Sequence, residues 1–150
     1  MLGNGDDLRV LPIVEIDLST LPEGANPIYS YEAKWLWDTE EAPLQIFHCP
    51  APLEPLLQRS IEDLCRKAFF HLGCRDWSRI DVRLDGDGHP QIIEVNPLPG
   101  VLPRPEQNSC FPKAARVAGL SYPEMILSVV DAACARLGLV EKSYARRCLL

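Results

Sequence analysis

The most regular hydrophobic pattern of the chain runs from residue 53 to residue 72. Apolar side chains recur there at the spacing of one helix face, namely Leu56, Leu57, Ile61, Leu64, Cys65, Ala68, Phe69 and Leu72. Gly73 follows directly, and glycine is the common residue just beyond the end of a helix. The pattern therefore predicts an amphipathic helix over 53–72 with one buried face.

A second pattern, of period two, follows this helix. In RIDVRL, residues 79–84, polar and apolar side chains alternate strictly, which indicates a half-buried strand. The sequence DGDG at 85–88 is typical of a tight turn. Residues 91–96 read as the returning strand, so the sequence predicts an antiparallel hairpin.

Shorter patterns fill the rest of the chain. Residues 8–17 read as a strand interrupted at Pro12, and the aromatic residues of 28–37 favour another strand. A short helix is expected over 113–118 and a longer one over 122–137. Strands and helices in this order predict an α+β fold, a mostly antiparallel sheet with helices packed on one side.

Polar residues in the returning strand indicate chemistry. Glu94 and Asn96 lie two residues apart and therefore share a face. With a turn at 87–88, Asp81 lies opposite Glu94, and Arg79 falls on the same surface. Oxygen ligands on a rigid hairpin suit Mg²⁺. An arginine beside them suits a phosphate or a developing negative charge.

A simpler interpretation makes these residues the solvated outer face of a two-layer sheet. The following NPLPG argues against it, because Pro97 and Pro99 end the strand ladder and Gly100 allows close approach of the backbone to a ligand. An EF-hand in DGDGHPQIIE is also a poor match. His89 occupies its fifth position, and its final glutamate is misplaced.

Composition narrows the possible partners. The net charge of -6 argues against nucleic acid as the main partner. No apolar run approaches the length of about 18 residues that a membrane span needs, and no secretory signal is visible. The six cysteines, at 49, 65, 74, 110, 134 and 148, lack C-x-x-C spacing, which favours reduced thiols in a cytoplasmic protein over disulfides or zinc.

Four segments in one order carry a family resemblance: YSYEAKW, CPAPL, LGCRDWSRIDVRLDGDGHPQIIEVNPLPG and PKAARVAGLSYPEMI. They resemble the C-terminal half of D-alanine–D-alanine ligases, members of the ATP-grasp superfamily. The resemblance implies an ATP-grasp C-terminal subdomain and an enzyme in which ATP phosphorylates the carboxylate of one amino acid. The amine of a second amino acid then attacks the acyl-phosphate. It also implies cytoplasmic peptidoglycan precursor synthesis and a possible homodimer of the full-length enzyme.

The resemblance implies roles for the residues of the hairpin and of NPLPG. Asp81, Glu94 and Asn96 correspond to the ligands of two Mg²⁺ ions, or Mn²⁺ in their place, that bridge the phosphates of ATP. Arg79 corresponds to an arginine that stabilises the acyl-phosphate and the tetrahedral intermediate. Gly100 corresponds to a glycine whose backbone N–H helps to bind the oxyanion.

Other segments correspond to substrate contacts. Lys34 corresponds to a lysine that reaches the ATP phosphates, although a lone lysine of this kind is usually a surface residue with a buried stem. Ile28 and Ile93 correspond to apolar positions around the adenine. In the segment after NPLPG, Ser109 is the candidate for binding the carboxylate of the second substrate, and Arg104 is the alternative.

The sequence also departs from the family. Trp35 replaces the usual tyrosine, and an indole N–H cannot accept a hydrogen bond as a hydroxyl does. The segment after NPLPG is longer than usual, so the substrates need not be two D-alanines. Residues 1–150 contain no counterpart of the upstream substrate and central ATP-binding parts, so we expect a C-terminal catalytic domain with little or no ligase activity alone. Two alternatives stay open: a ligase for another amino acid or peptide pair, and a truncated, non-catalytic module that binds nucleotide or Mg²⁺.

Overall fold

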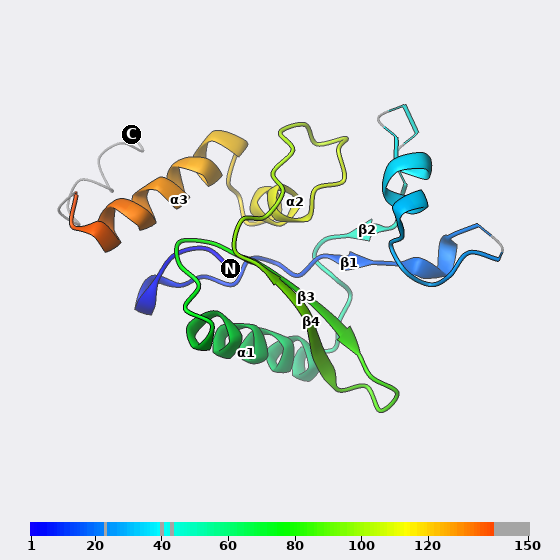
Figure 1. Ribbon diagram of the computed structural model, residues 1–150, viewed down its shortest axis with the longest axis horizontal. Coiled ribbons are helices and arrows are strands. Elements are labelled where there is room, and N and C mark those ends of the chain that lie inside the picture. The colour runs from blue at the N-terminus through cyan, green and yellow to red at the C-terminus, as the bar shows by residue number, and fades with distance from the viewer. Residues whose placement is uncertain (23, 40, 43, 140–150) are drawn as a thin grey trace. The chain divides into compact units, whose positions relative to one another are not determined.

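The computed structural model describes residues 1–22, 24–39, 41–42 and 44–139 (Figure 1). The chain divides into two compact units. Of the described residues, the first comprises Met1–Leu11, Leu53–Pro99 and 123–139, and the second comprises those of Pro12–Pro52 and Gly100–Tyr122. The cysteines within the described residues are free thiols, and Cys148 lies outside these residues.

The first unit contains the predicted hairpin. It consists of β3, Arg79–Leu84, and β4, Pro90–Asn96, which pair in antiparallel orientation. Asp81 pairs with Glu94, which confirms the predicted register at this position. Because directly opposed residues share a face of the sheet, both carboxylates project from the same side of the hairpin.

A β-bulge interrupts the hairpin next to this pair. The register shifts between Asp81 and Val82, so that Val82 pairs with Ile92 and Ile93 has no partner in the ladder. The bulge leaves Ile93 62% exposed. The sequence pattern did not predict this extra residue, because a continuous register would have paired Val82 with Ile93.

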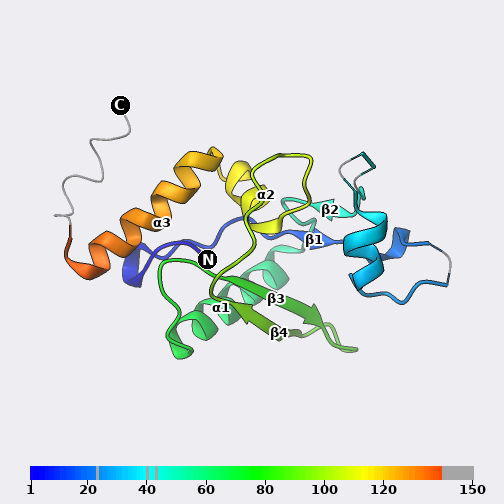
Figure 2. The ribbon, with the colours of Figure 1, turned by 45° about the horizontal axis from the view of Figure 1, so that its top comes forward.

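Helix α1, Pro55–His71, confirms the helix predicted over 53–72 and packs against β4 (Figures 1 and 2). Pro55 stands in the first turn, where its missing N–H removes no helical hydrogen bond. Gly73 follows the helix at a φ of 66°, a left-handed conformation that glycine adopts without steric cost. The buried apolar side chains of this unit include Leu2, Leu8, Leu11, Ile61, Cys65, Phe69 and Met125.

Helix α3, Tyr122–Leu137, has its predicted bounds, and a polar network fixes its C-terminal part within the first unit. The Asn4 side chain donates to Asp76 Oδ1 at 2.8 Å and to the carbonyl of Ala132 at 3.2 Å. Arg136 donates Nε and Nη2 to the two carboxylate oxygens of Asp76 at 3.0 and 2.8 Å. Asp76 therefore connects the N-terminal segment with the last turns of α3.

This network predicts a pH-dependent stability. The hydrogen bond from Arg136 lowers the pKa of Asp76, and Asn4 contributes in the same direction. A carboxyl whose pKa is lower in the folded state stabilises the fold above its unfolded pKa, and the contribution is lost as the pH falls through the folded value. We therefore expect Asp76→Asn to be less stable than the unsubstituted chain at pH 7, with the difference shrinking below about pH 4.

Urea unfolding at several pH values measures this difference in the free energy of unfolding. Urea is preferable to guanidinium, because a salt would screen the ion pair. Asp131→Asn, on the exposed surface of α3, is the matched control and should leave the pH dependence unchanged. A difference between Asp76→Asn and the unsubstituted chain that stays constant from pH 7 to about pH 3 would contradict the expectation.

The second unit contains the short strands β1, Glu15–Ile16, and β2, Phe47–His48, which pair in antiparallel orientation. The strand predicted over 8–17 is therefore wrong for most of its length. Pro12 lacks the N–H that a ladder needs, and it lies at the boundary where the chain passes from the first unit to the second.

The strand predicted over 28–37 is wrong as well. The segment forms a helical turn that continues as a π-helix over Ala33–Trp37. Ser30 begins this turn: its hydroxyl accepts the N–H of Ala33 at 3.2 Å, and its carbonyl accepts the N–H of Lys34 at 3.0 Å. These local hydrogen bonds outweigh the β-propensity of the aromatic side chains, which depends on packing in a sheet.

The remaining elements are short. Helix α2, Cys110–Val117, starts earlier than the helix predicted over 113–118, because Pro112 is tolerated in the first turn. Turns of 3-10 helix occupy Gly5–Asp7 and Leu18–Thr20. Within the described residues, no single helix has the length and apolar composition to cross a membrane. Helices α2 and α3 meet these two criteria only when they are counted together as a bent pair.

Candidate functional site

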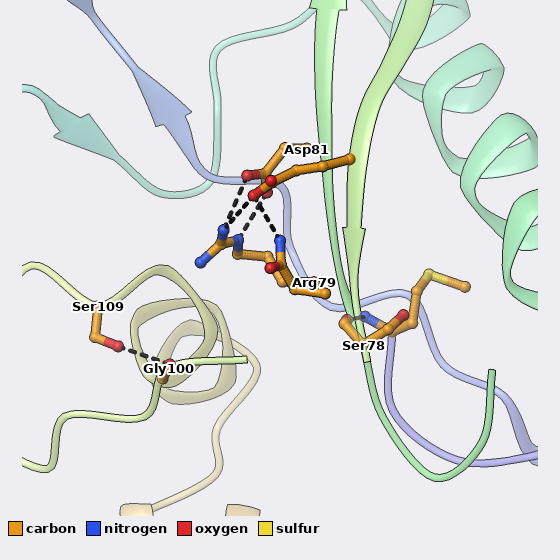
Figure 3. A network of polar contacts seen from close by, with 8 residues as sticks. Ser78, Arg79, Asp81, Gly100 and Ser109 are labelled. Carbon is orange, nitrogen blue, oxygen red and sulfur yellow. Dashed lines mark hydrogen bonds and ion pairs between the residues drawn. The ribbon is translucent and has the colours of Figure 1, made fainter. Parts of the chain in front are cut away.

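Arg79, Asp81, Glu94 and Asn96 meet on the polar face of the β3–β4 hairpin, and we call them the hairpin site. Figure 3 shows Arg79 and Asp81. Arg79 donates Nε and Nη2 to the two oxygens of Asp81, at 2.7 and 2.9 Å. The same Nη2 donates to Glu94 Oε1 at 3.0 Å, and Asn96 Nδ2 donates to that oxygen at 2.8 Å. The structure thus brings together the four residues that the sequence predicted for this face.

The two carboxylates of the hairpin site differ in their electrostatics. Partial burial raises the pKa of Asp81 against the opposing effect of Arg79, and Glu94 raises it further. The hydrogen bond from Asn96 lowers the pKa of Glu94. Two facing carboxylates share a proton readily and need positive charge between them to be ionised together. Arg79 supplies such a charge, so the site favours a positively charged group between the two carboxylates.

The donor set of the hairpin site fits a hard divalent cation. Arg79 Nη2 lies 2.9 Å from Asp81 Oδ2 and 3.0 Å from Glu94 Oε1, so both carboxylates already converge on one positively charged group. Carboxylate and amide oxygens are the ligands that Mg²⁺ and Mn²⁺ prefer.

The hairpin turn carries a second acidic cluster. Ligand atoms of Asp85, Asp87 and His89 lie within 4.8 Å of one another, and all three residues are exposed. Asp85 Oδ1 accepts the backbone N–H groups of Asp87 and His89 at 3.0 and 2.9 Å, while its Oδ2 accepts a hydrogen bond from Gln91 at 2.9 Å. These bonds account for the Asp85 carboxylate as part of the turn.

The second unit contains the segment predicted to contact ATP. Lys34 lies in the π-helix, and its Nζ is 5.2 Å from the centroid of the Trp35 ring, a cation–π distance. Lys34 is exposed, and Trp35 and Ile28 are 62% and 49% exposed. The segment thus presents an ammonium group and apolar surface to solvent.

The loop from Gly100 to Ser109 is closed by hydrogen bonds of its own (Figure 3). The Ser109 hydroxyl donates to the carbonyl of Gly100 at 3.0 Å and accepts the N–H of Leu102 at 3.3 Å. A serine hydroxyl has one hydrogen, so binding a substrate carboxylate would require this hydrogen to change partner. The Gly100 N–H has no acceptor among the residues that the structure describes. Arg104 is exposed on the same loop.

The closed loop predicts a cost for removing the Ser109 hydroxyl. Ser109 is 7% exposed, and Ser109→Ala leaves a carbonyl and an N–H of the loop without their partner. We expect the free energy of unfolding to fall by about 1–3 kcal/mol, measured by urea denaturation. Ser60→Ala, on the exposed surface of α1, is the control and should change stability by less than about 0.5 kcal/mol. Equal effects of the two substitutions would contradict the closing role of Ser109.

Asp38 is a residue that sequence reasoning missed. Its carboxylate accepts hydrogen bonds from Tyr29 Oη and Asn108 Nδ2, both at 2.7 Å, and from the N–H of Leu44 at 2.9 Å. Its own N–H donates to Ala33 at the start of the π-helix, at 3.0 Å. Asp38 therefore joins the segment that contains Lys34 to the loop that contains Gly100. Burial and the adjacent Asp38 carboxylate raise the pKa of Tyr29, which keeps its hydroxyl a donor.

Similarity to solved structures assigns the class of fold. The chain is similar to D-alanine–D-alanine ligase from Bacillus anthracis, solved as a complex with ATP, with a TM-score of 0.54 and 25% sequence identity. The match covers 62% of this chain and 31% of that chain. The α+β fold is thus that of an ATP-grasp protein, which confirms the predicted fold class.

The sequence comparisons define the family within that class. Residues 1–131 match the family described as D-ala D-ala ligase C-terminus, and the chain belongs to it. It is 35% identical over 125 residues to the D-alanine–D-alanine ligase of Haemophilus influenzae (strain PittEE) and 36% identical over 135 residues to that of Bordetella petrii. The matches cover 83% and 89% of this chain but 37% of either relative.

Proposed function

We propose that this chain is the C-terminal catalytic portion of an ATP-dependent ligase that joins two D-alanines through an acyl-phosphate, in peptidoglycan precursor synthesis. The observation that supports this most is the hairpin site, in which an arginine, two carboxylates and an amide converge within hydrogen-bonding distance. A non-catalytic remnant has no need to keep this combination of charges.

The hairpin site would provide the charge that phosphoryl transfer requires. Asp81, Glu94 and Asn96 would hold two Mg²⁺ ions, and a bound metal ion neutralises the developing charge on phosphate oxygens. Arg79 would stabilise negative charge on the acyl-phosphate and on the tetrahedral intermediate. The Gly100 N–H, which has no acceptor within the described residues, would donate to the oxyanion.

ATP is the proposed phosphoryl donor. The related Bacillus anthracis ligase was solved as a complex with ATP. In this chain the exposed ammonium group of Lys34 is suited to the phosphates, and the exposed apolar side chains of Ile28 and Ile93 are suited to the adenine.

A ligase for another pair of amino acids is the second candidate. Trp35 is 62% exposed and has no hydroxyl, and the Ser109 hydrogen is already bound to Gly100. Arg104, exposed on the same loop, offers a different partner for a substrate carboxylate. Under this proposal the chemistry is unchanged and the second substrate differs from D-alanine.

A graft tests the proposed function. The matched part of the Haemophilus influenzae ligase is replaced by residues 1–131 of this chain, and ATP-dependent phosphate release is measured with a panel of D- and L-amino acids. Release that requires D-alanine supports the first candidate, and release that requires another amino acid supports the second. A folded graft that binds ATP but shows no amino-acid-dependent release would favour a non-catalytic module.

A further inference from the structure

Arg79 contacts both carboxylate oxygens of Asp81. Nε contacts Oδ1 at 2.7 Å and Nη2 contacts Oδ2 at 2.9 Å, which is the bidentate geometry of a strong charge-assisted pair. Both side chains are partly protected from solvent, with 34% of Arg79 and 38% of Asp81 exposed. The guanidinium group is thus held in the position where a cation would contact this carboxylate.

Glu94 and Asn96 continue the same arrangement. Glu94 Oε1 accepts one hydrogen bond from Arg79 Nη2 and one from Asn96 Nδ2, at 3.0 and 2.8 Å. Asn96 therefore turns its amide nitrogen toward Glu94. An amide binds metal ions through its oxygen, so Asn96 would have to rotate its amide before it could share an ion with Glu94.

A metal ion and the guanidinium group cannot occupy this position together. Mg²⁺ lies about 2.1 Å from its oxygen ligands, within the space that Nη2 fills between the two carboxylates. Two positive charges about 4 Å apart also repel each other. Binding of the metal therefore requires Arg79 to leave at least one of the carboxylates.

We propose that Arg79 is an internal counter-cation of the hairpin site and competes with the divalent cation for Asp81 and Glu94. This inference rests on the proposed function, because it takes these residues to be the metal ligands. Metal binding displaces the guanidinium group and rotates the amide of Asn96. Arg79 then becomes available for the substrate's phosphate only when the site is loaded with metal, which makes its catalytic charge conditional on the cofactor.

The competition predicts that removing Arg79 strengthens metal binding. Mn²⁺ alone is titrated into the chain, and the free ion is followed by electron paramagnetic resonance. We expect Arg79→Gln to bind Mn²⁺ at least about fivefold more tightly than the unsubstituted chain, because one positive charge about 4 Å away is removed. Arg83→Gln, which removes the same charge from the same strand four residues farther on, should change the affinity less than about twofold.

The Asp81→Asn, Glu94→Gln double substitution, made in each background, defines the binding that belongs to the hairpin site. It separates this binding from any at Asp85, Asp87 and His89. Site-dependent binding that is equal or weaker in Arg79→Gln overturns the competition but leaves the metal site intact. If the double substitution leaves Mn²⁺ binding unchanged, the hairpin site does not bind the metal, and the proposed competition is overturned as well.

A measurement on the unsubstituted chain makes the test independent of how Arg79→Gln folds. The ¹⁵N-edited signal of Arg79 Nε–H reports its hydrogen bond to Asp81. We expect Mg²⁺ to shift or broaden this signal while the Arg136 Nε–H signal, from the ion pair with Asp76, stays in place. An Arg79 signal that does not change while Mg²⁺ saturates the hairpin site overturns the proposal.

Discussion

Replacing Asp81 with asparagine in the active graft should lower the rate of amino-acid-dependent phosphate release by at least about 100-fold, and up to 1,000-fold. Asparagine keeps the shape of the side chain but removes a negative charge from the hairpin site. Its NH₂ group also meets a donor of Arg79 where the carboxylate offered a second acceptor. Both effects weaken the binding of metal, and the guanidinium group of Arg79 is no longer held in its position.

The hairpin contains a matched control for this substitution. Asp87→Asn makes the same chemical change on the exposed turn between the same two strands, and it should leave the rate within about twofold. Initial rates at saturating ATP and Mg²⁺, with unfolding curves for each variant, separate a catalytic loss from a folding defect. If Asp81→Asn and Asp87→Asn have equal rates, Asp81 has no role in the reaction.

The largest effect on stability is expected for Phe69→Ala. Phe69 is 1% exposed and lies on the buried face of α1 with Ile61 and Cys65. Its truncation removes a ring from a packed core and leaves a cavity that neighbouring side chains fill only in part. We expect the free energy of unfolding to fall by about 3–5 kcal/mol. Urea denaturation, followed by far-ultraviolet circular dichroism, measures the change.

The adjacent residue is the control. Phe70 is 52% exposed, and its ring contacts that of Phe69 edge-on, with centroids 5.9 Å apart. Phe70→Ala removes the same number of atoms from a largely solvated position and should cost less than about 1.5 kcal/mol, chiefly through the lost ring contact. A larger loss for Phe70→Ala than for Phe69→Ala would mean that α1 buries a different face.

Elements with a regular pattern were predictable from the sequence. Helix α1 and strand β3 follow periods of 3.6 and 2 over their whole lengths, and the alternation of β3 together with a turn at 87–88 placed Asp81 opposite Glu94. The helical structure of segment 28–37 was not predictable, because the Ser30 hydroxyl and carbonyl begin a helical turn that aromatic composition does not reveal. Local hydrogen bonds decided this element.

Contacts between residues far apart in the sequence were a second feature of the fold that the sequence did not predict. Asp38 and Asn108 are 70 positions apart, and no pattern around either residue indicates that the Asn108 amide donates to the Asp38 carboxylate. The closed loop between Gly100 and Ser109 likewise depends on two hydrogen bonds of the Ser109 hydroxyl, which span nine and seven positions. Such pairings depend on how the chain folds back, which periodicity does not determine.

The bulge at Ile93 divides the hairpin into two parts that tolerate changes of length differently. On one side of it, Arg79 pairs with Asn96 and Asp81 with Glu94; on the other side the strands run in a register shifted by one residue. A lineage, or a protein engineer, could therefore lengthen, shorten or exchange the 85–89 turn while the four charged and polar side chains keep their spacing. Deleting Ile93 would remove that tolerance, and the spacing of the hairpin-site side chains would then depend on the length of the turn.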